Sequence, residues 1–144
     1  MEVSKKNQNL SSFCNDEKLI HHSKHLLLDL YRCDFEKIND ESFLRCILGN
    51  AAKLANAAVL NLISNKFEPQ GVTAIALLAE SHISIHTWPE SKYSAVDIFT
   101  CGQNMKPELA SKYLIDTLKA EEHFLRVIKR NPPSAVFKEI RTVF

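Results

Sequence analysis

Residues 72–101, VTAIALLAESHISIHTWPESKYSAVDIFTC, form the stretch of sequence that decides the fold. Three runs within it, 72–80, 82–88 and 93–101, are apolar and β-like. The PESK link at 89–92 carries Pro and Ser, which are typical of turns between strands. Because such short links join neighbouring strands in antiparallel fashion, the stretch predicts three strands of one antiparallel sheet.

The remaining chain adds two helices and further strands. After Asn39 or Asp40, both good helix N-caps, apolar residues recur at helical spacing as far as residue 55. Pro107 suits the first turn of a second helix. The predicted order is β-α-β-β-β-β-α-β. The other predicted strands are 24–31, 58–64 and 124–128, with a turn at 68–71 and a weak edge strand within 135–144.

This order predicts the α+β class: a two-layer sandwich in which two helices cover one face of a mainly antiparallel sheet. The uncovered face needs a partner, so we expect a homodimer. Residues 1–22 are polar and without period, and we expect a flexible N-terminal arm. Residues 23–144 are then a single domain.

Composition narrows the class of function. The 144 residues carry 18 basic and 17 acidic side chains, and this balance gives no reason to expect nucleic acid or an anionic membrane as partner. Apolar runs such as 74–79 are far shorter than the ~20 residues that a membrane span needs. The first twenty residues lack the apolar run of a secretory signal, so we expect a cytoplasmic protein. The four cysteines include no CxxC pair, and Cys14, Cys33 and Cys46 read as fillers or exposed thiols.

Polar side chains interrupt the predicted strands between 78 and 102. Strand alternation places them in two sets, each on a common face: His82, Ser84 and His86, and Asp97, Phe99 and Cys101. Three interpretations compete. The polar residues could occupy the solvent side of the sheet, or His82, His86 and Cys101 could bind a metal, although no further ligand falls at an obvious spacing. The third interpretation is nucleophilic chemistry by a serine with a nearby histidine and thiol.

A family resemblance favours the third interpretation. Residues 67–102, FEPQGVTAIALLAESHISIHTWPESKYSAVDIFTCG, resemble the processing and active-site region of prokaryotic-type S-adenosylmethionine decarboxylase, a pyruvoyl enzyme of polyamine synthesis. The words ESHISIHTWPE and VDIFTCG are long and unusual. The resemblance continues, less sharply, through KHLLLDLYRCD at 24–34, and covers roughly residues 24–128.

The resemblance implies a proenzyme that cuts itself between Glu80 and Ser81. The products are a β chain, 1–80, and an α chain, 81–144, in which Ser81 has become the pyruvoyl cofactor. Attack of a hydroxyl on the preceding amide needs local distortion of that peptide bond. We expect Ser81 to lie in a bend before the strand proper, because strict alternation would turn it away from the face of His86.

His86 and Cys101 take the proton-transfer roles. His86 suits the processing base, because the pKa of an imidazole lies near neutrality. In the family the pyruvoyl carbonyl forms a Schiff base with the substrate amine and accepts electrons as carbon dioxide leaves. The resemblance assigns Cys101, in FTCG, to the proton donor that completes decarboxylation.

Four further positions are carried over from the family. Phe67 matches an aromatic side chain that stacks on adenine, and Glu90 a carboxylate that hydrogen bonds the ribose. Asp29 stands, in a loose alignment, where the family has a glutamate near the active site. Thr73 stands where the family often has a serine that assists processing, and it keeps the hydroxyl while adding a methyl group.

The resemblance therefore implies conversion of S-adenosylmethionine to its decarboxylated form, the aminopropyl donor for spermidine. The β and α chains stay together as one αβ unit, and two units pair with their active sites near the interface. Two alternatives stay open: the same pyruvoyl machinery acting on arginine or ornithine, and a non-catalytic regulatory homologue. No metal is expected in any of these.

Overall fold

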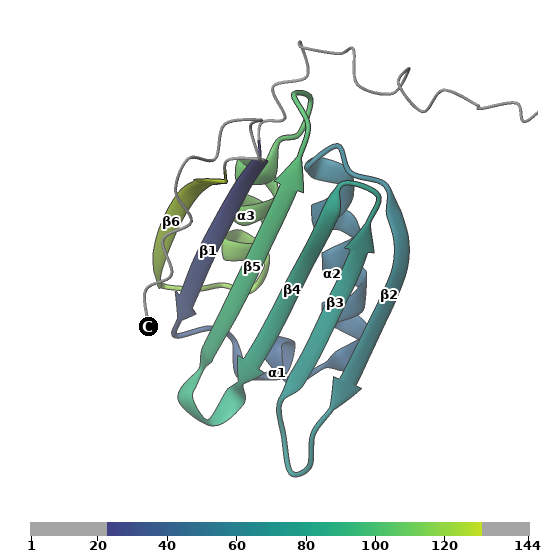
Figure 1. Cartoon of the computed structure of the whole chain (residues 1–144). Coiled ribbons are helices and arrows are strands. Elements are labelled where there is room, and N and C mark those ends of the chain that lie inside the picture. Colours follow the sequence, from purple (N-terminus) through teal and green to yellow (C-terminus); the bar gives the residue numbers. More distant parts are fainter. Residues whose placement is uncertain (1–22, 131–144) are drawn as a thin grey trace, which may run out of the picture.

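The sheet of this protein has six strands, all paired antiparallel in the order β2-β3-β4-β5-β1-β6 (Figure 1). The structure is a computed structural model that describes residues 23–130. The strands are β1 (Ser23–Tyr31), β2 (Val59–Lys66), β3 (Val72–Leu78), β4 (Ser81–Trp88), β5 (Tyr93–Cys101) and β6 (Glu122–Arg130).

Two long helices, α2 (Glu41–Leu54) and α3 (Pro107–Thr117), cover one face of the sheet (Figure 1). Asp40 caps α2, because its side chain accepts a hydrogen bond from the N–H of Phe43 at 2.9 Å. Pro107 begins α3, as the sequence predicts. The chain also forms a one-turn helix α1 (Phe35–Ile38) and a short 3-10 turn η2 (Pro89–Ser91), neither of which is predicted from the sequence.

The core lies between the helices and the sheet. α2 packs on β2, β3 and β4, and α3 packs on β1 and β5. Every second residue of the central strands is buried under them. Fully buried side chains of this core include Leu26, Leu28, Leu44, Leu48, Ile83, Ile85, Ile98 and Leu114. The predicted α+β two-layer architecture is confirmed.

The strand predictions are right in position and differ at their ends. The first run of the deciding stretch stops at Leu78, since Ala79 and Glu80 form the turn into β4. β6 extends beyond the predicted 124–128 and pairs with β1 at the sheet edge, where all nine of its residues are exposed. The predicted N-terminal arm and the predicted strand within 135–144 lie outside the described residues. Between Ser23 and Arg130, no helix has the length and apolar character needed to cross a membrane.

The face opposite the helices, called the open face below, has no covering element among residues 23–130 (Figure 1). Large apolar side chains are exposed at both of its sides. Ile63 and Leu77 are 59% and 51% exposed on β2 and β3, and Phe124 and Ile128 are 51% and 42% exposed on β6. Between these two apolar borders the open face carries polar side chains of β4, β5 and β1, among them the candidate residues His86, Cys101 and Asp29.

Candidate active site

Ser81 is the first residue of β4, directly after the turn formed by Ala79 and Glu80. Its Cα pairs with Leu78 on β3 and with Thr100 on β5, so the predicted bend before the strand is replaced by a distorted residue inside the strand. Ser81 has φ +155°, a conformation that residues other than glycine rarely adopt and that costs about 1–3 kcal/mol. The distorted backbone therefore lies at the residue where the sequence predicts the scissile bond.

Cys101 ends β5 at the same end of the sheet. Its Sγ lies 3.3 Å from the Oγ of Ser23, the residue opposite it on β1, and Ser23 is 8% exposed. Thr100 is the strand partner of Ser81, the predicted pyruvoyl precursor, and Cys101 is the next residue along β5. His82 and Phe99 pair beside them with ring centroids 5.9 Å apart. Ser81 and Cys101 thus lie at the same end of the sheet, called the serine end below.

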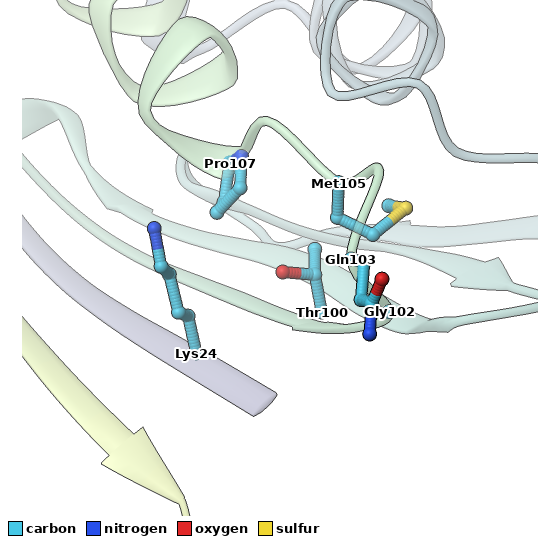
Figure 2. Close-up of a pocket in the computed structure, with 6 residues that line it drawn as sticks. All are labelled: Lys24, Thr100, Gly102, Gln103, Met105 and Pro107. Carbon is cyan, nitrogen blue, oxygen red and sulfur yellow. The ribbon is translucent and has the colours of Figure 1, made fainter. Parts of the chain in front are cut away.

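A cavity of about 430 Å³ lies between the strand ends of β1 and β5 and the loop into α3 (Figure 2). It reaches Thr100, the strand partner of Ser81, and Lys24 at its edge forms an ion pair with Glu108 at 2.6 Å. None of the predicted substrate-binding residues lines it. The lining residues are Lys24, Thr100, Gly102, Gln103, Met105 and Pro107.

His86 and Thr73 form a pair on the open face, at the opposite end of β4. The two residues are directly opposite each other on β4 and β3, and Thr73 Oγ1 lies 2.9 Å from His86 Nδ1. When the Nδ1–H donates to the threonine oxygen, the lone pair of the neutral imidazole is left on Nε2, where it can accept a proton. The pair therefore holds the imidazole in one orientation, with Nε2 not engaged by Thr73.

A hollow of about 380 Å³ adjoins this pair. Phe67, half exposed, and Glu90 both line it, and Gln70 donates a hydrogen bond to the Glu90 carboxylate at 3.1 Å. Gly71 has φ +99°, and its lack of a side chain allows its backbone to lie close to that of Thr87, because a Cβ there would lie 3.1 Å from the carbonyl oxygen of Thr87. The structure thus brings Phe67, Thr73, His86 and Glu90 together, and we call this the histidine end. The complete lining is Phe67, Gln70, Gly71, Thr73, His86, Thr87, Trp88 and Glu90.

Asp29 does not line this hollow. It lies in the same row of the open face as His86, two strands away, with Ala95 between them. Its carboxylate accepts a hydrogen bond from the hydroxyl of Tyr93 at 2.5 Å and lies 4.0 Å from Arg126. Burial, followed by the bond to Asp29, raises the pKa of Tyr93 to about 12. In the single chain Asp29 therefore has a partner of its own and touches no other predicted site residue.

The serine and histidine ends are far apart in one chain. Ser81 and His86 are five residues apart on one strand, so their Cα atoms are separated by roughly 16 Å at ~3.3 Å per residue. An imidazole cannot reach the Ser81 Cα–H over that distance.

The structure does not support a metal site at His82, His86 and Cys101. Residues 23–130 include no group of three or more His, Cys, Asp or Glu side chains placed to hold a metal ion.

The whole arrangement can be compared with known proteins. The family model described as S-adenosylmethionine decarboxylase matches residues 24–131. The chain belongs to the S-adenosylmethionine decarboxylase family. It is 58% identical over 119 residues to the S-adenosylmethionine decarboxylase proenzyme of Synechococcus sp. (strain WH7803), covering 83% of this chain and 93% of that protein. It is 44% identical over 107 residues to the proenzyme of Methanococcus maripaludis, covering 74% and 88%.

The fold agrees with this family. The crystal structure of the adenosylmethionine decarboxylase from Aquifex aeolicus VF5 superposes with a TM-score of 0.74 at 36% identity, covering 83% of this chain and 98% of that one. The family resemblance read from 67–102 is therefore confirmed.

Sequence reasoning missed four side chains that contact the candidate residues: Ser23 at Cys101, Gln70 at Glu90, and Tyr93 and Arg126 at Asp29. Had the sequence predicted that strand 23–30 pairs antiparallel with strand 94–101, it would have placed Ser23 opposite Cys101.

Proposed function

We propose that this chain is a self-processing decarboxylase of S-adenosylmethionine, cleaved between Glu80 and Ser81 into chains 1–80 and 81–144. The observation that carries the proposal is the φ of +155° at Ser81, which puts distorted backbone at the residue that must attack its own peptide bond. The relatives at 52–58% identity, all named S-adenosylmethionine decarboxylase proenzyme, support the same reaction.

The cleavage needs one nucleophile and one base. Ser81 Oγ attacks the carbonyl carbon of Glu80, the C–N bond breaks, and an ester joins Glu80 to the Ser81 side chain while the Ser81 amine is freed. A base, His86 by this proposal, then removes the Cα proton of Ser81. The Cβ–Oγ bond breaks, Glu80 leaves as a carboxylate, and water hydrolyses the remaining dehydroalanine to release ammonia and leave a pyruvoyl group.

The serine end fits this cofactor, because Ser81 begins the new chain there and Cys101 is one residue from its strand partner. When present, the pyruvoyl carbonyl supplies the electron sink for loss of carbon dioxide. Cys101 is the proposed proton donor to the substrate carbon, and the hydroxyl of Ser23 at 3.3 Å holds its Sγ in place.

Substrate recognition belongs to the histidine end in this proposal. The exposed ring of Phe67 offers a stacking surface to adenine, and the Glu90 carboxylate, held by Gln70, accepts hydrogen bonds from ribose hydroxyls. These two groups distinguish an adenosyl substrate from arginine or ornithine, which have neither ring nor sugar.

A homodimer that pairs the two ends is part of the proposal. The roughly 16 Å between Ser81 and His86 is closed when a two-fold axis brings the serine end of one chain against the histidine end of its partner. The exposed apolar borders of the open face, at Ile63 and Leu77 and at Phe124 and Ile128, support contact between two such faces. The cytoplasm stays the predicted compartment.

The test is the intact mass of the purified protein under denaturing conditions, followed by decarboxylation assays. Two chains are expected, the smaller beginning with a pyruvoyl group, while a Ser81→Ala variant stays as one chain. The processed protein is expected to release carbon dioxide from S-adenosylmethionine and not from arginine or ornithine. One stable full-length wild-type species, or turnover of arginine or ornithine alone, would overturn the proposal.

A further inference from the structure

The turn that carries the scissile bond is tied at two points to Ala58. The N–H of Ala79 donates to the carbonyl oxygen of Ala58 at 2.9 Å. In return, the N–H of Ala58 donates to Oε2 of Glu80 at 3.1 Å. One residue of a distant segment therefore contacts both turn residues, and the second contact uses the side chain of the residue whose carbonyl is to be cleaved.

Ala58 is itself well anchored. The preceding N–H of Ala57 donates to the carbonyl oxygen of Ala52 in the last turn of α2, at 2.9 Å. The following residue, Val59, begins β2 and pairs with Leu78, the last residue of β3. Ala58 thus connects the end of α2 to the sheet. A group bonded to it is held relative to the core, even though Ala79 and Glu80 lie in a turn.

We propose that the Glu80 side chain is a positioning residue for self-cleavage, acting through the N–H of Ala58. This inference rests on the proposed function. The attack requires the Ser81 hydroxyl to stay close to the Glu80 carbonyl carbon, and free rotation of a two-residue turn would lower the fraction of chains in that arrangement. A Glu80 side chain bonded to Ala58 restrains the rotation of the residue that bears this carbonyl.

The contact also explains why a glutamate suits this position. Its side chain is long enough to reach Ala58 from the turn, and its carboxylate forms a charge-assisted bond with a backbone N–H. Glutamine keeps both the length and an accepting oxygen. Aspartate keeps the charge but is one methylene shorter, and alanine removes the acceptor altogether.

The test follows cleavage of chains made by cell-free synthesis, sampled over time and read by intact mass. Loss of a bond to a charged acceptor predicts that Glu80→Ala and Glu80→Asp are cleaved about tenfold more slowly than the wild type. Glu80→Gln keeps the length and an accepting oxygen without the charge, so it is expected to be cleaved faster than Glu80→Ala and within about fivefold of the wild type. Glu36→Ala, which removes an exposed glutamate of α1, is the matched control and is expected to be cleaved at the wild-type rate.

Two further readouts separate positioning from general loss of stability. Uncleaved Glu80→Asp and Glu80→Gln, each combined with Ser81→Ala, are both expected to have thermal midpoints well above the assay temperature, so that unfolding does not account for a difference in their cleavage rates. Once cleaved, all variants should show the wild-type kcat per pyruvoyl group. Wild-type cleavage with an equally fast Glu80→Ala overturns the positioning role alone, and a wild type that is never cleaved overturns the proposed function on which it rests.

Discussion

Thr73 Oγ1 lies 2.9 Å from His86 Nδ1, across a directly paired position of β3 and β4. Because the two residues face each other in the ladder, the bond requires no loop to order and no long side chain to be fixed. Of the two imidazole nitrogens, Nδ1 is the one engaged, which leaves Nε2 for chemistry. The threonine hydroxyl thus acts on the orientation of the proposed processing base.

Replacing Thr73 with valine tests this relationship. Valine keeps the branched shape and removes the oxygen, so we expect cleavage about tenfold slower, the cost of one hydrogen bond to a group that becomes charged. Thr73→Ser keeps the hydroxyl and should be cleaved within about twofold of the wild-type rate. The measurement is the time course of intact mass. Equal rates for the valine variant and the wild type would show that the hydroxyl has no role.

Removing the Cys101 thiol should separate the two reactions of this protein. Cys101→Ala is expected to be cleaved, because the thiol takes no part in the acyl shift, yet to lose about 10²–10⁴-fold in decarboxylation, the range for one general acid. Cys46→Ala, on the exposed side of α2, is the matched control and should keep both activities. A Cys101→Ala enzyme with wild-type turnover would assign the proton donor to another group.

The raised pKa of Tyr93 predicts how the stability of the protein changes at alkaline pH. The pKa of this tyrosine in the folded protein is raised to about 12, above the value near 10 expected when unfolded. The unfolded chain therefore loses this proton first, and the free energy of unfolding falls as pH rises from about 10 to about 12. Urea unfolding of the wild type and Tyr93→Phe at pH 9, 10 and 11 measures this. The wild type should lose more stability than the variant over that range, and parallel losses would contradict the assignment.

Local signals predicted most of this fold. The Asp40 cap and the apolar stripe after it determine α2, and the tight links on either side of β4 determine its two antiparallel neighbours. The place of β6 beside β1 could not be predicted, because these strands are distant in sequence and neither edge is marked by a short link. The α+β class followed from element order, while the position of this edge depends on packing.

Site residues were predicted by resemblance, and their mutual distances were not. Alternation placed His82, Ser84 and His86 correctly on one face. The positive φ at Ser81 has no signal in the sequence, since serine normally avoids it. The separation of Ser81 from His86 does follow from their spacing of five, but only when both residues are known to lie in one continuous strand.

That separation leads to a prediction for mixed dimers. Ser81→Ala lacks the nucleophile and His86→Ala lacks the proposed base, so each variant alone should stay uncleaved. If each site combines the serine end of one chain with the histidine end of the other, a mixed dimer has one complete site, made of Ser81 from the His86→Ala chain and His86 from the Ser81→Ala chain. Co-expression of the two should therefore cleave the His86→Ala chain alone.

Different affinity tags on the two chains let intact mass identify which one has been cut. The control is co-expression of His86→Ala with the double variant Ser81→Ala/His86→Ala, which contains no intact histidine and should yield no cleavage. Sites built within single chains predict no cleavage in either mixture, because every chain then lacks one essential group. Cleavage of His86→Ala by itself would instead show that His86 is not the processing base.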